Sequence, residues 1–372
     1  MDATLLKSDA FWSEEKPVAI TAAGVEAPAL NEVPPLIFFR TSGSTGGPKW
    51  LGLSREALLL SARVVNAHLE VDEASVWGLA LPIHHVGGYG VIARAHQANC
   101  GFSAFGKAWQ VHDYLSWLES AGVTHTSLVP AQVHDLVVAG LHAPEALRAV
   151  VVGGGELAED IGSAARKLGW PVLASYGMTE AGSQVATQGF DCLQQPFIKA
   201  PIETLGHWQL RLEDDGCLAI AGKSLFDGQL VQEGKDWHYQ PREGEWFVTR
   251  DRVKLGDAGI TPLGRDDLRV KVLGELVDIG AIEERLLELS GRRLKRRGFV
   301  VAAVPDARAE HALVPVFDAA VDPEAIREIL AAYDEEASGL ERLQKHVTLY
   351  PLPCSELGKP QRGRVLELLA EL

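Results

Sequence analysis

The sequence predicts an α/β protein with a large N-terminal domain, which includes a β-rich part, and a small α+β domain at the C-terminal end. Three observations support this prediction. Buried-strand patterns alternate with helical patterns up to residue 177, short strands separated by Gly, Asp and Pro dominate from about residue 200, and strands and helices mix in the last part of the chain. Strand–helix alternation is typical of a largely parallel sheet, and closely spaced short strands are typical of an antiparallel one.

Each element of the first half has its own signal. The apolar run LIFFR (36–40) predicts a buried strand that leads into a loop rich in Gly, Ser and Thr. Ser54 is the expected N-cap of a helix over 55–68, because a serine hydroxyl can accept a hydrogen bond from the first turn. Further strands are expected at 75–82, 124–130, 148–155 and 171–177, and helices at 112–121, 131–140 and 158–168.

The later part of the chain is patterned differently. Short strands are expected within 207–222, 245–251 and 252–262, as in an antiparallel β-subdomain. After these, the pattern predicts strands at 268–273, 299–304 and 313–317 and helices at 281–289 and 323–332. We therefore expect two domains, residues 1–264 and 265–372, with the β-rich part of the first at about 200–263.

Composition narrows the possible functions. The chain of 372 residues carries 35 Lys and Arg against 50 Asp and Glu, a net charge of −15, which disfavours binding to nucleic acid or to an anionic membrane. We find no signal peptide and no apolar run of about 18 residues that could span a membrane. The four cysteines are scattered without a CxxC pair, which favours free thiols in a reducing cytoplasm over a disulfide framework or a zinc site.

The loop TSGSTGGPK (41–49) is the strongest functional signal. Its glycines permit backbone N–H groups to point into one concavity, and its hydroxyls and lysine add donors and a cation, as phosphate binding requires. It is not a Walker loop, because Pro48 precedes the lysine and Trp50 follows it. The alternative is a flexible surface loop between strands. The candidate phosphate-binding residues are Thr41, Ser42, Gly43, Ser44, Thr45, Gly46 and Lys49.

At these residues the chain resembles the adenylate-forming superfamily of acyl-CoA synthetases, firefly luciferase and peptide-synthetase adenylation domains. Further segments resemble the motifs of that superfamily in the same order: LPIHHVGGYG (81–90), GGGE (153–156), YGMTEAGSQ (176–184), WFVTRD (246–251), GRDDLRVKVLGELV (264–277) and SELGKPQR (355–362). The phosphate loop begins at residue 41, whereas members of the superfamily carry a longer N-terminal subdomain before it. The resemblance implies the adenylate-forming fold, with a shortened N-terminus and a mobile C-terminal domain.

The resemblance also implies roles for individual residues. His85 would border the carboxylate substrate, Thr179 would contact the α-phosphate region, Glu180 would help to hold Mg²⁺, and Lys359 would be the catalytic lysine. Asp267 would be the pivot of the C-terminal domain. The residues implied for binding the adenosine part of ATP are Gly154, Gly155, Glu156, Tyr176, Asp251 and Arg265.

Within the superfamily the chain is most similar to the o-succinylbenzoate–CoA ligases of menaquinone biosynthesis. The shared features are SLVPAQ (127–132), the Ser-Gln ending of YGMTEAGSQ, the Thr-Arg-Asp at 249–251, and Arg94, which lies where that family has a basic residue near the benzoate carboxylate. A guanidinium suits this role because it binds carboxylate in a bidentate manner. The alternative is that Arg94 is a solvated helix residue. Gly87, Gly88 and Ser183 are further candidate pocket residues.

We therefore expect a cytoplasmic enzyme without nucleic-acid or membrane partners. It would use ATP, Mg²⁺ and coenzyme A to convert a carboxylic acid into an acyl-adenylate and then a thioester. Another aryl- or acyl-CoA ligase is one alternative, and a catalytically inactive nucleotide-binding relative is another. A homodimer could compensate for the shortened N-terminus. The basic cluster at 292–297 could bind a CoA phosphate or form a solvated surface.

Overall fold

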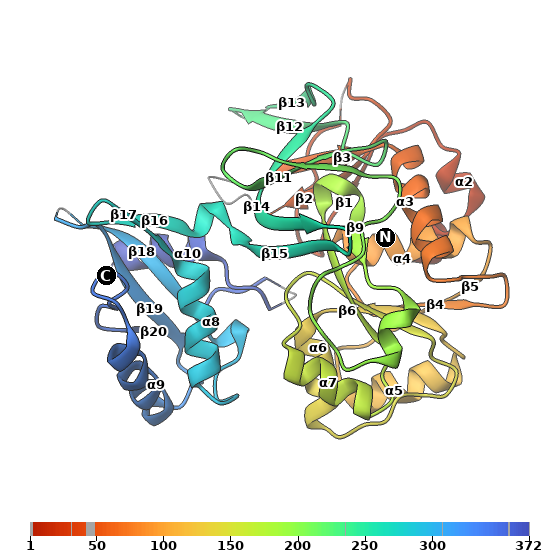
Figure 1. Cartoon of the computed structure of the whole chain (residues 1–372). Coiled ribbons are helices and arrows are strands. Elements are labelled where there is room, and N and C mark those ends of the chain that lie inside the picture. The colour runs from red at the N-terminus through yellow and green to blue at the C-terminus, as the bar shows by residue number, and fades with distance from the viewer. Residues whose placement is uncertain are drawn as a thin grey trace. The chain divides into compact units, whose positions relative to one another are not determined.

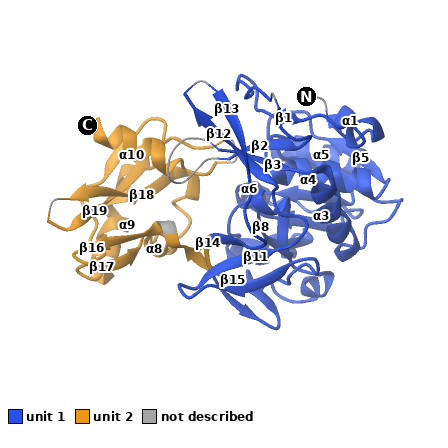
Figure 2. Ribbon diagram, turned by 90° about the horizontal axis from the view of Figure 1, so that it is seen from above, with its two compact units in different colours: residues 1–41, 48–249, 253–262 blue, residues 42–47, 250–252, 263–372 orange. Residues whose placement is uncertain are grey.

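The computed structural model describes residues 3–30, 32–41, 49–234, 236–306, 308–355 and 358–371, without the side chains of Thr4 and Asp267. The chain divides into two compact units, coloured separately in Figure 2. Unit 1 comprises residues 1–41, 48–249 and 253–262, and unit 2 comprises residues 42–47, 250–252 and 263–372. The last segment of unit 1 ends at Pro262, and the long segment of unit 2 begins at Leu263. The expected boundary between a fixed and a mobile domain, at 264/265, stays a prediction.

A six-stranded sheet organises unit 1 (Figure 1). Its order is β5-β4-β6-β7-β8-β9, with every neighbouring pair parallel except β8 and β9. The predicted α/β fold class with a largely parallel sheet is therefore confirmed. The strands are β4 (Val76–Leu79), β5 (Gly101–Ala104), β6 (His125–Leu128), β7 (Ala149–Val152), β8 (Val172–Met178) and β9 (Ser183–Thr187).

Helices cover both faces of this sheet: α5, α6 and α7 lie on one face and α3 and α4 on the other (Figure 1). They are α3 (Arg55–His68), α4 (Val86–Gln97), α5 (Val111–Ser120), α6 (Pro130–Val138) and α7 (Glu159–Lys167). The Ser54 hydroxyl accepts a hydrogen bond from Ala57 N at 3.2 Å, which confirms the expected N-cap of α3. The predictions at 75–82, 112–121, 124–130, 131–140, 148–155, 158–168 and 171–177 are confirmed to within a few residues.

The strand order has a switch point between β4 and β6. From β4 the chain passes through α4 to β5 on one side, and from β6 it passes through α6 to β7 on the other side. The connections after these two neighbouring strands therefore leave in opposite directions. In open α/β sheets, such a switch point opens a crevice outside the carboxyl ends of the strands, where ligands bind.

The strand expected at 36–40 lies outside the parallel sheet. It is β2 (Ile37–Thr41), which forms an antiparallel hairpin with β3 (Lys49–Leu53) in a five-stranded sheet of order β1-β2-β3-β12-β13. The other strands are β1 (Val18–Ile20), β12 (Gly228–Glu233) and β13 (Asp236–Pro241). Pairing of β3 with β12 joins segments about 180 residues apart, beyond the reach of local sequence patterns.

The remaining strands of the β-rich part form a sheet of order β10-β11-β14-β15. They are β10 (Gln209–Leu212), β11 (Cys217–Ala221), β14 (Phe247–Gly256) and β15 (Gly259–Arg265), and β10 pairs with β11 in antiparallel register. The β-rich texture after residue 200 is thus confirmed, although β12 and β13 extend the sheet that begins with β1. Near the N-terminus, α1 (Ala3–Leu6) and α2 (Asp9–Trp12) contribute Leu6 and Trp12 to the core of unit 1.

Unit 2 is a small α+β structure. It contains the β16–β17 pair and the sheet β18-β19-β20, together with α8, α9 and α10. The predicted elements at 268–273, 281–289, 299–304, 313–317 and 323–332 are all present. The bounds are β16 (Arg269–Val272), β17 (Glu275–Asp278), α8 (Ile279–Leu289), β18 (Phe299–Asp306), β19 (Glu310–Asp318), α9 (Pro323–Glu336), β20 (Val347–Leu349) and α10 (Arg362–Ala370).

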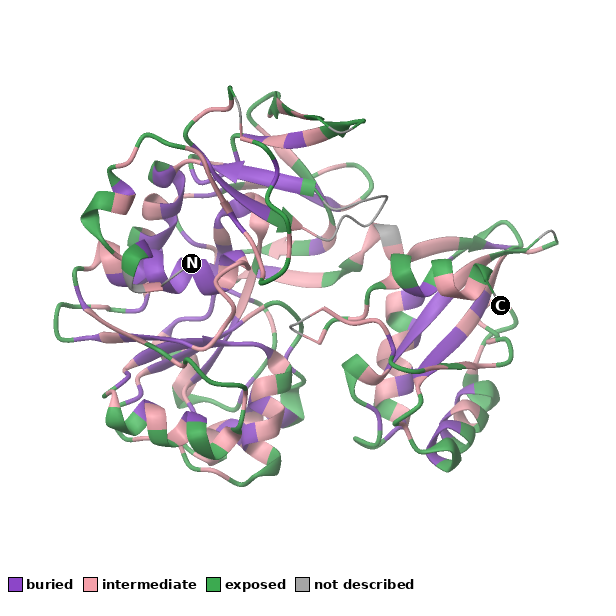
Figure 3. Cartoon of the chain, turned by 180° about the vertical axis from the view of Figure 1, so that it is seen from behind, coloured by how far each residue is buried: buried purple, intermediate pink, exposed green. Residues whose placement is uncertain are grey.

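Each unit has its own apolar core, as the buried strands in Figure 3 indicate. Burial of apolar side chains is the main favourable contribution to folding, so the core of each unit contributes to the stability of that unit. Within the part of the chain that the structure describes, no helix is long and apolar enough to cross a lipid bilayer.

Candidate active site

The parallel sheet of unit 1 brings four of the sequence motifs to one edge. The segment 81–90 follows β4, SLVPAQ (127–132) spans the end of β6, GGGE (153–156) follows β7, and YGMTE (176–180) covers the end of β8. Since the carboxyl ends of parallel strands meet at the same edge, these motifs gather there. This is the edge at which the switch point between β4 and β6 opens.

The hairpin of β2 and β3 carries the predicted phosphate loop. Thr41 is the last residue of β2 and Lys49 the first of β3, and the two are paired in register. Ser42, Gly43, Ser44, Thr45 and Gly46 lie outside the described residues. The structure therefore describes the two ends of the loop, Thr41 and Lys49, which the antiparallel pairing of β2 and β3 holds side by side.

The segment after β4 leads into the amino end of α4. His85 occupies the N-cap position, and its ring centroid lies 4.5 Å from that of His84. Gly87 and Gly88 form the first turn. A Cβ at Gly88 would lie 2.3 Å from the carbonyl oxygen of Pro82, so only glycine fits at this position. The tight approach places the positive end of the helix dipole at the carboxyl edge of the sheet.

Arg94, on α4, is buried, with 2% of its surface exposed. Its Nη1 donates to the Ser127 hydroxyl at 3.2 Å, and its Nη2 lies 3.5 Å from the Ser183 hydroxyl. Side chains of a helix point back toward its amino end, so the guanidinium is directed to the carboxyl edge of the sheet. The alternative of a solvated helix residue is therefore wrong.

Among the described residues, no carboxylate forms an ion pair with Arg94, so its charge is not neutralised by them. Burial lowers the pKa of its guanidinium to about 9, so the group stays a cation at neutral pH. A buried charge is costly unless it is paired. An arginine left in this state at a ligand-binding edge is typical of a site that receives an anion.

The turn between β8 and β9 presents Tyr176, Thr179, Glu180 and Ser183. A register shift separates Tyr176 from Gly177, and Thr179 and Glu180 lie in the short 3₁₀ helix η1 (Thr179–Ala181). A Cβ at Gly177 would lie 1.7 Å from the carbonyl oxygen of Ser183, which excludes any other residue there.

Ser183 has a φ of 119°, a conformation that side chains rarely adopt. Such backbone strain persists only where the surroundings enforce it, and it is often found at binding sites. Here it accompanies the approach of the Ser183 hydroxyl to Arg94. The Glu180 carbonyl accepts a hydrogen bond from Phe226 N at 2.8 Å, which fixes the backbone that carries the candidate Mg²⁺ ligand.

The glycine turn after β7 is exposed. Gly154 has a φ of 76°, and Gly155 follows it. Glu156 forms an ion pair with Lys199 at 2.8 Å, so its carboxylate is already engaged. This suits a role in which the backbone of the turn lines adenine better than one in which the Glu156 side chain binds it.

In unit 2, the two residues predicted to bind ribose form an ion pair. Arg265 Nη1 lies 3.2 Å from Asp251 Oδ1. Asp267, the predicted pivot, belongs to the 3₁₀ helix η3 (Asp266–Leu268), directly after β15.

Lys359 lies on a tight turn before α10. Ser355 N donates to the Lys359 carbonyl at 2.8 Å, and Lys359 N donates to the Ser355 hydroxyl at 3.2 Å. Gly358, with a φ of 74°, allows the chain to reverse between them. The Lys359 side chain is exposed.

The motif SELGKPQR (355–362) ends with Arg362. Arg362 Nη1 donates to the Val301 carbonyl at 2.7 Å, and Nη2 pairs with the largely buried carboxylate of Glu283. Glu283 in turn accepts from Val301 N at 2.6 Å. Burial raises the pKa of Glu283, although the charge of Arg362 opposes the shift. This pair ties the start of α10 to β18 and α8, and none of the sequence motifs includes Glu283.

Two further observations bear on the basic cluster at 292–297 and on metal binding. In the basic cluster, Arg293 pairs with Glu328 at 2.5 Å and Arg296 pairs with Glu284, which favours a charge-balanced surface over a CoA-phosphate site. Among the described residues, no group of three or more His, Cys, Asp or Glu side chains is placed to hold a metal ion.

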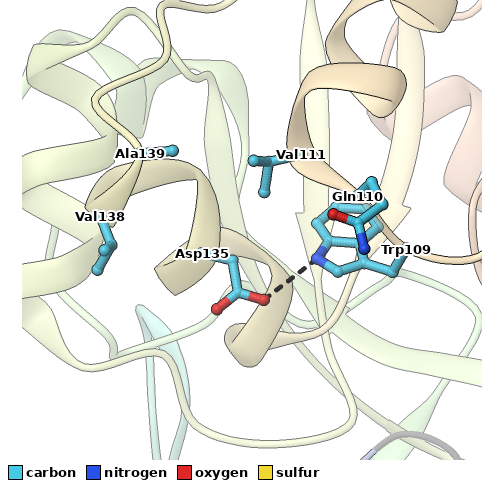
Figure 4. Close-up of a pocket in the computed structure, with 6 residues that line it drawn as sticks. All are labelled: Trp109, Gln110, Val111, Asp135, Val138 and Ala139. Atoms are coloured by element: carbon cyan, nitrogen blue, oxygen red, sulfur yellow. Dashed lines mark hydrogen bonds between the residues drawn. The ribbon is translucent and has the colours of Figure 1, made fainter.

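The surface also has two hollows away from the predicted residues. One, of about 270 Å³, lies between α5 and α6, where Asp135 accepts a hydrogen bond from the Trp109 indole at 3.1 Å (Figure 4). The other, of about 360 Å³, lies on the five-stranded sheet beside Arg40 and Trp50. None of the residues predicted to contact ATP or the acid lines either hollow.

Comparison with known proteins identifies the class. The AMP-binding enzyme family matches residues 2–222, more than half of the chain. The chain belongs to this family.

Two curated relatives share one name. The 2-succinylbenzoate–CoA ligase of Staphylococcus epidermidis is 31% identical over 238 residues, which cover 62% of this chain and 48% of the relative. That of Escherichia coli is 31% identical over 230 residues, covering 61% and 47%. The chain thus spans about half the length of the curated relatives that it matches.

Among solved structures, o-succinylbenzoate CoA synthetase of Bacillus subtilis in complex with its acyl-adenylate intermediate aligns with a TM-score of 0.74 at 21% identity, covering 88% of this chain and 68% of that one. The same enzyme in complex with ATP and a magnesium ion gives a TM-score of 0.73 at 21% identity, covering 89% and 69%. The similarity establishes the shared fold.

Proposed function

We propose that the protein is an AMP-forming acid–CoA ligase that activates o-succinylbenzoate. The observation that carries this proposal is Arg94, a buried cation without a carboxylate partner among the described residues, at the switch-point edge of the sheet. A substrate with two carboxylates needs one of them held as an anion while the other reacts. A guanidinium can bind the first in a bidentate manner.

The relatives support this choice of substrate. The curated relatives named above are 2-succinylbenzoate–CoA ligases, and the Bacillus subtilis enzyme has been solved with its acyl-adenylate and with ATP and magnesium. We therefore propose ATP, Mg²⁺ and CoA as the other reactants and cofactor of this protein.

In the first half-reaction, a carboxylate oxygen of the acid attacks the α-phosphorus of ATP. A new oxygen–phosphorus bond forms, and the bond from that phosphorus to the bridging oxygen breaks, which releases pyrophosphate. Negative charge builds up around the α-phosphate. In our proposal Lys359, Lys49 and the N–H groups of the 43–47 loop stabilise that charge. No side chain acts as the nucleophile.

Thr179 and Glu180 suit a magnesium site. A hydroxyl and a carboxylate are hard oxygen donors, which Mg²⁺ prefers, together with water and phosphate oxygens. Mg²⁺, when bound, would supply positive charge between the phosphates. Tyr176, Gly154 and Gly155 would hold adenine, and Asp251 and Arg265 the ribose, as the resemblance of their motifs implies.

In the second half-reaction, the thiol sulfur of CoA attacks the acyl carbon. The carbon–sulfur bond forms, AMP leaves with the oxygen it gained, and the thiol proton passes to solvent. The acyl-adenylate is sensitive to water, so we propose that unit 2 moves about Asp267 between the two half-reactions. A homodimer and a cytoplasmic location remain predictions of the same proposal.

The test is to incubate purified protein with ATP, Mg²⁺ and a panel of carboxylic acids, and to measure pyrophosphate release before and after CoA is added. We expect release with o-succinylbenzoate, and formation of its CoA thioester when CoA is present. Turnover only with unrelated acids would replace the substrate by that of another acyl-CoA ligase. No turnover with any acid would favour an inactive nucleotide-binding relative.

A further inference from the structure

The guanidinium of Arg94 lies over the indole ring of Trp77. The distance from its central carbon to the ring centroid is 4.9 Å. Trp77, on β4, is fully buried. A cation above an aromatic face is attracted by the negative potential of the ring, and more strongly when water is excluded. The indole therefore stabilises the charge of Arg94 in the absence of a carboxylate.

One amide fixes both partners of this stack. Asn66, on α3, is buried, and its Oδ1 accepts a hydrogen bond from Trp77 Nε1 at 3.2 Å. Its Nδ2 donates to the carbonyl oxygen of Arg94 at 2.9 Å and to Gln97 Oε1 at 2.8 Å. The indole plane and the helical turn that carries Arg94 are thus tied to the same side chain.

The stack leaves the donors of Arg94 for a ligand. A guanidinium has five N–H donors and is usually paired with a carboxylate when buried. A carboxylate of the protein would occupy these donors and compete with an acidic substrate. The face of an indole attracts the cation without accepting a hydrogen bond from its edge. Among the described residues, the hydroxyls of Ser127 and Ser183 are the hydrogen-bonding groups found at that edge.

Space around the guanidinium is also restricted. A Cβ at Gly90, one turn before Arg94, would lie 3.0 Å from Arg94 Nη2. Together with Trp77 beneath it and Ser127 beside it, this leaves the guanidinium one well-defined position.

We propose that Trp77 and Asn66 are positioning residues that hold Arg94 charged and oriented for a second substrate carboxylate, with the indole face taking the place of a protein counter-ion. This inference rests on the proposed function. It predicts that the electron density of the Trp77 ring sets how strongly the enzyme prefers a dicarboxylate to a monocarboxylate.

The experiment replaces Trp77 alone by 5-fluorotryptophan and then by a difluorinated tryptophan. Fluorine withdraws electron density from the ring while the shape and the N–H donor to Asn66 are kept. The kcat/KM is measured for o-succinylbenzoate and for 4-oxo-4-phenylbutanoate, which lacks the benzoate carboxylate. The ratio of the two kcat/KM values, o-succinylbenzoate over 4-oxo-4-phenylbutanoate, does not depend on the fraction of active enzyme when both are measured in one preparation. We expect it to fall by about 3- to 10-fold over the series, with KM for ATP unchanged.

Trp170 provides the matched control. It is as buried as Trp77 and donates its indole N–H to the Leu141 carbonyl at 2.7 Å, and no arginine of the described chain stacks on it. Fluorination at position 170 should leave the ratio unchanged. Asn66→Ala, which frees both the indole and the turn of Arg94, should lower the ratio as fluorination of Trp77 does.

An unchanged ratio in the fluorinated Trp77 enzymes, with activity retained, overturns the inference and leaves the proposed function intact. A fall of equal size with fluorine at Trp170 also overturns it. If the unmodified protein releases no pyrophosphate with either acid, the proposed function fails, and the inference fails with it.

Discussion

Arg94 in unit 1 and Lys359 in unit 2 are both cations that the sequence motifs emphasise, but the protein holds them in opposite ways. Arg94 is buried, lies over an indole and approaches two hydroxyls. Lys359 is exposed, and hydrogen bonds of its own backbone shape the turn that carries it.

These two environments suit the two cations to different tasks. A buried cation held by an indole ring and two hydroxyls can recognise one shape of ligand, at the cost of desolvation. A cation on an exposed turn stays in contact with water and avoids that desolvation cost, so it suits a role in one step of a reaction rather than permanent binding.

Replacing Lys359 should have the largest effect. We expect Lys359→Ala to lower the rate of adenylation by about 10²–10³-fold, because one preorganised charge at the α-phosphate is lost. Thioester formation from pre-made acyl-adenylate should change far less. Lys345→Ala, at another exposed lysine of unit 2, is the control and should leave both rates unaltered. Equal losses in the two half-reactions would contradict the role assigned to Lys359.

Replacing Arg94 should separate binding from stability. We expect Arg94→Met to raise KM for o-succinylbenzoate by about 10- to 100-fold while KM for ATP stays the same, because charge-assisted hydrogen bonds are lost. The same variant should melt at a higher temperature, since a buried unpaired charge is removed.

Arg148→Met is the matched control for Arg94, because this arginine is partly exposed and pairs with Glu70 at 3.8 Å. It should change neither quantity appreciably. A change in KM confined to ATP would remove Arg94 from the acid pocket.

The Glu283–Arg362 pair should matter for the stability of unit 2. Glu283→Gln leaves the partly buried Arg362 beside a neutral partner, so the free energy of unfolding should fall by about 2–3 kcal/mol. Glu284→Gln, at the adjacent residue, breaks only the half-exposed pair with Arg296 and should cost less than about 1 kcal/mol. Chemical denaturation of both variants tests this. Equal costs would mean that the burial of Glu283 is irrelevant.

The smallest expected effect is the loss of folding stability at acidic pH. Burial lowers the pKa of His125 and of His207 to about 4, against about 6.5 in the unfolded chain. The unfolded state therefore binds more protons between these values, so the free energy of unfolding should fall as the pH is lowered from 6.5 toward 4.

At pH 5 we expect a loss of about 1–2 kcal/mol for each of the two histidines relative to pH 7. His125→Gln should reduce the pH dependence, whereas His112→Gln, at an exposed site, should not. The check is denaturant unfolding of each variant between pH 5 and pH 7. An unchanged slope in His125→Gln would show that this histidine titrates normally.

Local patterns in the sequence predicted most elements correctly, because strands of the parallel sheet are continuous apolar runs and Ser54 caps α3 with its hydroxyl. They did not reveal that β2 pairs with β3 in a separate sheet, or that β3 pairs with β12. Such pairings depend on contacts between distant segments. Burial of Glu283 against Arg362 was missed for the same reason, since the two residues are 79 positions apart.

The candidate site was predicted unevenly. The motifs single out Arg94, Tyr176, Glu180 and Lys359 as candidates, but a motif cannot tell a buried arginine from a solvated one. That distinction required the fold, which places Arg94 beneath the edge of the sheet. Trp77 and Asn66 carry no motif at all, because their part in the site arises from packing between α3, α4 and β4.

The most direct test of the account uses ATP labelled at the α-phosphorus. Incubation with Mg²⁺ and o-succinylbenzoate, without CoA, should give an acid-dependent labelled product with the mass of the acyl-adenylate. Addition of CoA should convert it to labelled AMP and the thioester. Formation of labelled ADP instead, or no acid-dependent change in the nucleotide, would contradict transfer of the α-phosphorus to the acid.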